Sequence, residues 1–216
     1  MKNKVITPKE ALNHIKSGDI VMVGGFLKCG TPQLVIQEIL TSDIKDLTLI
    51  ANDTCFMDSD RGLLVSHKKL KKVIASHIGT NPETGRQMNE GSLEVELVPQ
   101  GTLAERIHAG GAGLGGVLTP TGIGTLVEKG KEKLTIDGKE YLLEKPLYAD
   151  VALIYGSKVD PIGNISFHGT TRNFNTMMAM AAKTVIVEAE EYLSDPMNPD
   201  DVVISGIFVD HIIKKG

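Results

Sequence analysis

The stretch that decides the fold is Asp19–Pro32, DIVMVGGFLKCGTP, in which an apolar run passes through a glycine turn into a helix start. The run is continuous rather than alternating, which is typical of a strand covered on both faces. Thr31 and Pro32 then open a helix. Backbone N–H groups converge at such a turn, beside a helix N-terminus that favours negative charge. We expect an oxyanion or phosphate cradle here, with a simple tight turn as the alternative; Thr31-Pro32 excludes a P-loop, which needs Lys-Ser/Thr.

The rest of the chain continues this alternation of strands and helices. Further strands are expected at 46–51, 73–76, 93–98, 150–155, 184–188 and 207–213, and helices at about 8–17, 32–40, 102–109 and 172–183. The pattern predicts an α/β fold, with a mostly parallel sheet covered by helices on both faces. Asp137-Gly138 between two short alternating runs predicts a small β-hairpin insertion near 133–144. Residues 1–216 are expected to form a single domain.

Composition narrows the class of protein. The 216 residues are 41% hydrophobic and carry a net charge of -4, so the overall field attracts neither nucleic acid nor an anionic membrane. The apolar runs fall short of the roughly 20 residues that span a bilayer. The N-terminus does not resemble a signal peptide, and Cys29 and Cys55 lie far apart without a C-x-x-C motif, so we expect a cytoplasmic protein without a disulfide. No metal-binding motif is present, and the Lys68–Lys72 cluster is interpreted as a solvated strand end, with a phosphate contact as the alternative.

Neutral amides follow two of the expected strands. Asn52 comes after the strand that ends at Ala51, and Gln100 follows Val98-Pro99. Ligands of parallel sheets bind at the carboxyl ends of strands, so both amides are candidates for holding a carbonyl or carboxylate. The alternative is that they merely cap the following turn or helix.

Two other features resemble functional sites but are interpreted otherwise. A G-x-G-x-x-G match spans Gly111–Gly116, yet a helix is expected before it and none after it, so dinucleotide binding is not expected. Glu188, Glu190 and Glu191 follow or end a strand and could mimic a catalytic carboxylate. Solvated or helix-capping roles are the favoured interpretation for these three.

Several blocks, in order and over nearly the whole chain, resemble the α subunits of family I (3-oxoacid type) coenzyme A transferases that act on acetate, butyrate and acetoacetate. The first is Gly-Gly-Phe-x-x-x-Gly-x-Pro within 24–32; the others are IAND, ASHIGTNPETG, VPQGTLAE, GGAG, LTPTGIGT and RNFN. An α subunit of a succinyl-CoA:3-oxoacid or 3-oxoadipate transferase is the runner-up. A non-catalytic ligand-sensing module of related fold is a remote alternative.

The resemblance implies a fold related to the sugar-phosphate isomerases and a ping-pong transfer of CoA. Its nucleophilic glutamate lies in a Ser-Glu-Asn-Gly motif of the family's β half, which this sequence lacks. It therefore implies a β-subunit partner, in an α2β2 assembly, and CoA and short-chain carboxylates as substrates without a permanently bound cofactor. Asn52 and Gln100 would face the acyl group. The CoA-binding residues would be Gly24, Gly25, Phe26, Leu27, Lys28, Cys29 and Gly30.

Overall fold

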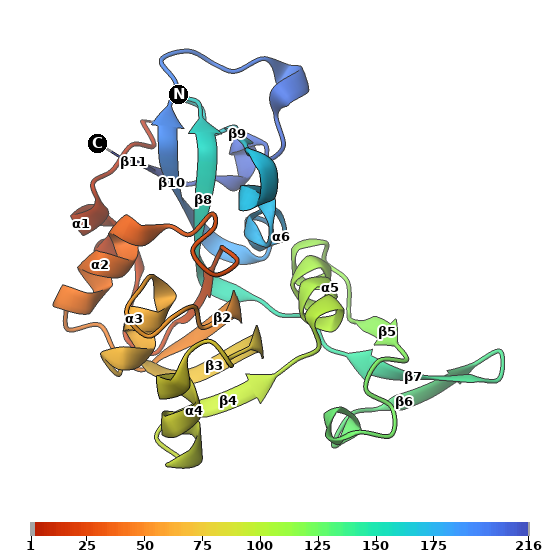
Figure 1. Ribbon diagram of the computed structural model, residues 1–216. Helices are drawn as coiled ribbons and strands as arrows, with labels where there is room; N and C mark the ends of the chain where they lie inside the picture. Colours follow the sequence, from red (N-terminus) through yellow and green to blue (C-terminus); the bar gives the residue numbers. More distant parts are fainter. Residues whose placement is uncertain (1–2, 216) are drawn as a thin grey trace.

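A parallel sheet forms the body of the protein in the computed structural model, which describes residues 3–215 (Figure 1). Its strands run in the order β11-β10-β8-β1-β2-β3-β4, and each neighbouring pair is parallel. Their bounds are β1 Ile20–Val23, β2 Leu47–Asp53, β3 Leu70–His77, β4 Glu94–Leu97, β8 Ala149–Val159, β10 Ala182–Tyr192 and β11 His211–Lys214. A short antiparallel strand, β9 (Ile165–Ser166), pairs with β8. The prediction of a mostly parallel sheet is confirmed.

Helices cover both faces of this sheet, because its strands are apolar on both. They are α1 Pro8–Ala11, α2 Gln33–Thr41, α3 Arg61–Ser66, α4 Pro82–Asn89, α5 Gln100–Gly111 and α6 Asn175–Met178. Along β1, Val21 and Val23 join one buried cluster with residues of α2 and α3. Met22 joins the other with residues of α5 and α6. The alternation of side chains along a strand thus divides the core in two.

A small antiparallel sheet projects beyond α5, away from the body (Figure 1). It contains β5 (Val117–Thr119), β6 (Lys133–Ile136) and β7 (Lys139–Glu144) in the order β5-β7-β6. The predicted hairpin at 133–144 is therefore confirmed, and Asp137-Gly138 forms its turn with positive φ at both residues. The third strand, β5, was not expected from the sequence.

Some predicted elements differ from the structure. The helix expected at 8–17 has its capping box between Thr7 and Glu10 but is α-helical only to Ala11, with a 3-10 turn at Leu12–His14. The helix expected at 172–183 is wrong: a 3-10 turn ends at Arg172, α6 is short, and β10 begins at Ala182. Pairing of β10 with β8 outweighs the helix preference of this Met- and Ala-rich segment. No helix within residues 3–215 is both long and apolar enough to cross a membrane.

Candidate active site

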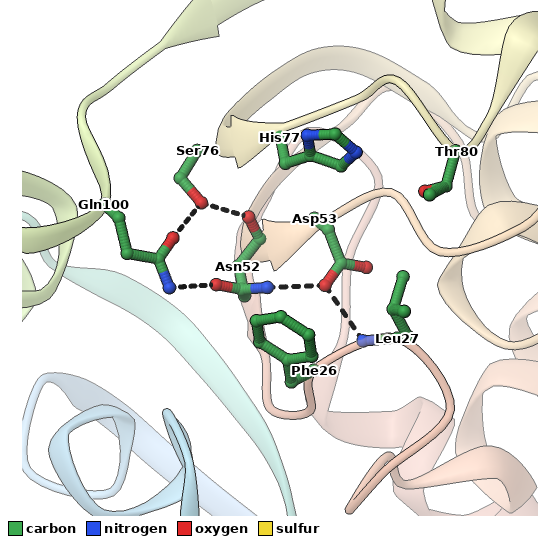
Figure 2. A pocket seen from close by; sticks show the side chains of 8 residues that line it. All are labelled: Phe26, Leu27, Asn52, Asp53, Ser76, His77, Thr80 and Gln100. Atoms are coloured by element: carbon green, nitrogen blue, oxygen red, sulfur yellow. Dashed lines mark hydrogen bonds between the residues drawn. The ribbon is translucent and has the colours of Figure 1, made fainter.

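A cavity of about 480 Å³ opens at the carboxyl ends of β2 and β3, beside the glycine turn that follows β1 (Figure 2). Its lining residues are Phe26, Leu27, Asn52, Asp53, Ser76, His77, Thr80 and Gln100. Parallel strands bring their carboxyl ends to one edge of the sheet, and this edge is where ligands of such folds bind. The cavity therefore lies where the chain order predicts a site.

The two amides predicted from the sequence meet in this pocket. Gln100 stands at the start of α5, and its Nε2 donates to Oδ1 of Asn52 at 2.6 Å. The hydroxyl of Ser76 contacts Oε1 of Gln100 and lies 2.7 Å from the carbonyl oxygen of Asn52. Asn52 is 2% exposed, whereas Gln100 is exposed. Gln100 is therefore the amide better placed to reach a ligand.

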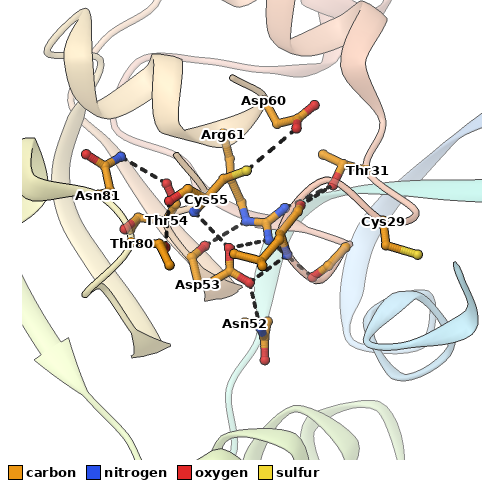
Figure 3. A network of polar contacts seen from close by, with 12 residues as sticks. Cys29, Thr31, Asn52, Asp53, Thr54, Cys55, Asp60, Arg61, Thr80 and Asn81 are labelled. Atoms are coloured by element: carbon orange, nitrogen blue, oxygen red, sulfur yellow. Dashed lines mark hydrogen bonds and ion pairs between the residues drawn. The ribbon is translucent and has the colours of Figure 1, made fainter. Parts of the chain in front are cut away.

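A buried ion pair lies beneath these amides (Figure 3). Nη2 of Arg61 is 2.6 Å from Oδ1 of Asp53, and the two side chains are 0% and 1% exposed. The same Oδ1 accepts from the N–H of Cys55 at 2.7 Å. Oδ2 accepts from Nδ2 of Asn52 at 2.6 Å and from the N–H of Leu27 at 2.9 Å. Four donors thus satisfy one carboxylate.

These contacts decide the protonation of Asp53. Burial by itself raises the pKa of a carboxyl, because it disfavours the charged form. At Asp53 the positive charge of Arg61, together with hydrogen bonds to the carboxylate, outweighs burial and holds the pKa below its usual value. The pocket therefore contains a carboxylate that remains ionised but is fully engaged.

The glycine turn is built for close approach. Gly25 has φ of +115°, and a Cβ there would lie 2.2 Å from Oγ1 of Thr31. Gly30 has φ of +66°, and its Cβ would lie 2.6 Å from the carbonyl oxygen of Thr171. Side chains other than hydrogen are excluded at both positions, so the sequence was right to place a sharp turn here.

The N–H groups of this turn already have acceptors within the chain. Gly24 donates to the carbonyl of Leu153 at 2.9 Å, and Phe26 donates to that of Cys29 at 3.0 Å. Gly25 donates to Oδ1 of Asn173 at 3.0 Å. An oxyanion role for these three N–H groups would require exchange of these bonds, and it stays a prediction.

The side chains of the turn point to different surroundings. Phe26, 49% exposed, and Leu27 line the pocket. Nζ of Lys28 lies 5.7 Å from the centre of the Phe56 ring. Sγ of Cys29 lies 3.2 Å from Oγ1 of Thr170. The first two residues are thus the part of the turn that a ligand in this pocket would meet.

The other sequence candidates lie elsewhere. Oε2 of Glu188 accepts from the N–H of Leu34 at 2.7 Å and so caps α2, which confirms the helix-capping interpretation. Glu190 and Glu191 are exposed. The lysines of Lys68–Lys72 lie around the start of β3, at the end of this strand opposite the pocket, where Lys72 pairs with Glu94 and Glu96. The 111–116 glycines end α5 and lead toward β5.

Sequence reasoning missed several site residues. Ser76, His77 and Thr80 lie within the ASHIGTNPETG block, which gave the only signal for them. Asn173 of the RNFN block holds the glycine turn. Arg61 gave no signal at all, because an arginine within a short helical segment is ordinarily exposed.

The fold and the site together define an α/β protein with a ligand pocket at the carboxyl edge of a parallel sheet. The chain belongs to the coenzyme A transferase family, whose model matches residues 5–215. The α subunit of acetoacetyl-CoA:acetate/butyrate CoA transferase of Clostridium acetobutylicum is 53% identical over all of this chain and 99% of its own. The α subunit of acetate CoA-transferase of Escherichia coli is 51% identical over 99% of this chain and 97% of its own.

Solved structures share the fold at low sequence identity. An acyl-CoA transferase of Escherichia coli O157:H7, in a thioester complex with CoA, superposes with a TM-score of 0.88 at 21% identity; the match covers 99% of this chain and 47% of that one. Glutaconate coenzyme A-transferase of Acidaminococcus fermentans gives a TM-score of 0.85 at 23% identity, over 98% of this chain and 75% of that one. The chain thus spans about half of the first structure, and both confirm the predicted fold class.

Proposed function

We propose that this chain is the α subunit of a heteromeric CoA-transferase that moves CoA from a short-chain acyl-CoA to acetate, butyrate or acetoacetate. The observation that carries the proposal is the state of the carboxylate in the pocket. Asp53 is the one acid among the lining residues, and Arg61 with three further donors occupies both of its oxygens. A carboxylate so engaged is a poor nucleophile. The attacking glutamate would therefore come from a β subunit.

In the proposed cycle, a carboxylate oxygen of that glutamate attacks the thioester carbonyl, the C–S bond breaks, and CoA leaves as a thiolate from a mixed anhydride. The thiolate then attacks the glutamyl carbonyl, which gives a glutamyl-CoA thioester and releases the donor's acyl group as a carboxylate. An acceptor carboxylate reverses both steps.

Gln100 is assigned the acyl site in this cycle. Each attack places negative charge on a carbonyl oxygen, and one fixed donor at that oxygen lowers the barrier by roughly 3 kcal/mol. Nε2 of Gln100 uses one hydrogen on Asn52 and has a second. That hydrogen is the proposed donor.

CoA would lie against residues 24–30, with the exposed ring of Phe26 and the side chain of Leu27 at the pocket. CoA and acyl-CoA would act as substrates, without a permanently bound cofactor. The assembly would be an α2β2 protein of the cytoplasm. These assignments extend the similarity to the two named α subunits.

The proposal is tested with the chain alone and coexpressed with a β subunit. We expect CoA transfer only from the pair, and borohydride trapping followed by peptide mapping should place the modified glutamate in the β subunit. Gln100→Ala should lower kcat about 100-fold with little change in the KM for acyl-CoA. Gln37→Ala, at an exposed glutamine of α2, is the matched control. Activity of the isolated chain would contradict the proposal.

A second candidate function concerns the acceptor. One of the two subunits of the succinyl-CoA:3-ketoacid coenzyme A transferase of Helicobacter pylori is 46% identical over 98% of this chain. An acceptor and donor panel with acetate, acetoacetate, butyrate and succinate, assayed on the coexpressed pair, separates the two functions.

A further inference from the structure

The amides of the pocket stand at one end of a hydrogen-bond chain whose other end is a buried ion pair (Figures 2 and 3). Gln100 donates to Asn52 at 2.6 Å, and Asn52 donates to Asp53 at 2.6 Å. Asp53 in turn pairs with Arg61 at 2.6 Å. Each group in this series therefore touches the next, from the exposed Gln100 to the fully buried Arg61.

The charge of Asp53 fixes the direction of the whole series. An ionised carboxylate only accepts hydrogen bonds, so Asn52 must turn its Nδ2 toward Asp53. Its Oδ1 then faces Gln100, which must answer with Nε2. The orientation of the Gln100 amide is thus set by an anion that it does not touch.

Arg61 anchors that anion to the glycine turn. Its Nε donates to the carbonyl of Asp53 at 2.6 Å, and its Nη1 donates to Oγ1 of Thr31 at 3.0 Å. The carbonyls of Gly24 and Gly25 lie 3.5 and 3.4 Å from its guanidinium nitrogens. One side chain therefore ties α3 to the end of β2 and to the turn after β1.

The backbone around the pair is strained, which indicates that the contacts over-determine this region. Leu27, Cys55 and Asp60 are non-glycine residues with φ of 49°, 52° and 50°. Such conformations cost on the order of 1–3 kcal/mol each and persist where the surroundings enforce them. Leu27 and Cys55 each donate a backbone N–H to Asp53, and Asp60 directly precedes Arg61.

We propose that Arg61 and Asp53 are positioning residues of the acyl site, which fix the direction in which Gln100 presents its second Nε2 hydrogen to the acyl oxygen. This role rests on the proposed function of the chain. The pair acts through Asn52 and Gln100 and leaves the nucleophile to the partner.

Replacement of Asp53 by asparagine should reverse the series. The carbonyl oxygen of the introduced amide would take the place of Oδ1, because Arg61 and the N–H of Cys55 both donate there. The nitrogen of that amide would then face Asn52, which must turn its oxygen to meet it. Gln100 would flip in consequence, and its Nε2 would leave the position from which it reaches the substrate.

The test compares Asp53→Asn and Arg61→Lys in the coexpressed pair, with Arg86→Lys as the matched control. Arg86 is 48% exposed and pairs with Glu83 and Glu90, so its variant should keep the natural kcat. Asp53→Asn should lower kcat per folded complex about 10- to 100-fold, with the KM for acyl-CoA changed less than about twofold. Arg61→Lys retains the charge and should fall between Asp53→Asn and the natural protein.

A second readout separates this proposal from the proposed function. In the full chain by itself, the side-chain amide NMR signals of Asn52 and Gln100 should shift in Asp53→Asn and stay in place in Arg86→Lys. If the natural pair transfers no CoA, the proposed function fails, and the NMR shift alone decides whether Asp53 orients the amides. Natural kcat in Asp53→Asn, or unmoved amide signals, would overturn the positioning role.

Discussion

Two buried carboxylates, at the end of β2 and within β10, show how differently one fold treats the same chemical group. Asp53 and Glu188 are each 1% exposed. Burial raises the pKa of Glu188, and the N–H groups of Leu34 and Gln33 offset it only in part. At Asp53 the balance is reversed, because the guanidinium of Arg61 lies in direct contact and the pKa is lowered.

The difference teaches that a strand position and a carboxylate do not make a site. Only Asp53 lines the pocket, and only its charge is held by a buried cation. Glu188 serves the N-terminus of α2. The glycine turn joins the two regions, since Arg61 contacts it from one side and the turn at Gly169–Arg172, which packs on β8, contacts it from the other.

The largest expected effect comes from removal of the cation. Arg61→Met leaves Asp53 buried without its partner, so we expect the free energy of unfolding to fall by about 3–5 kcal/mol. Arg86→Met, at the exposed ion pairs of α4, should cost less than about 1 kcal/mol. Urea unfolding of the full chain measures both; equal losses would remove the contrast between the two arginines.

The turn between the regions is the next most sensitive point. Gly30→Ala places a Cβ 2.6 Å from the carbonyl oxygen of Thr171 at a positive φ, and we expect a loss of roughly 2–4 kcal/mol. Gly85 lies inside α4 with nothing within 4 Å of a Cβ. Gly85→Ala should therefore stabilise the chain by up to about 1 kcal/mol. Melting of the two variants side by side tests the prediction, which a stable Gly30→Ala variant would refute.

The pH dependence of stability distinguishes the two carboxylates. The pKa of Glu188 is raised in the folded chain, so its contribution to stability is full below the unfolded pKa and is lost as pH rises through the folded pKa. Asp53 has the opposite sign: its contribution is present above the unfolded pKa and is lost as pH falls through the folded pKa.

Glu188→Gln removes the first of these titrations. We therefore expect the Tm of Glu188→Gln, relative to the natural chain, to increase between about pH 4 and pH 8. Asp53→Asn should show a relative Tm that decreases over the acid part of this range. Differences that stay constant with pH would show that the two carboxyls do not differ in this way.

The smallest effect is expected at Glu190, an exposed neighbour of Glu188 on the same strand. Tyr155 donates a hydrogen bond to it, and glutamine can accept the same bond. Glu190→Gln should change the free energy of unfolding by less than about 0.5 kcal/mol. A loss of more than about 2 kcal/mol would place Glu190 with the buried carboxylates rather than with the surface.

Much of the architecture was predictable, because strands buried on both faces leave continuous apolar runs in the sequence. The run before Gly24 and the Asp137-Gly138 turn each encode their structure locally. The helix expected at 172–183 failed because long-range pairing of β10 with β8 decides that segment. Helices α3 and α4 escaped notice, since short and largely polar helices carry a weak periodic signal.

The site divides in the same way. Asn52 and Gln100 were found because parallel strands and the helices after them place such residues at one edge. The charge that orients them was not, since Asp53 and Arg61 are eight positions apart and their contact depends on the path of the chain between β2 and α3.

The sequence by itself thus determined the layered fold, the sharp turn at Gly24–Gly30 and the two amides, because each depends on local pattern and on the order of elements along the chain. The tertiary structure alone decided which acid keeps its charge. That outcome depends on whether a cation reaches the carboxylate in the dry interior, and Coulomb attraction over 2.6 Å exists only after the chain has folded.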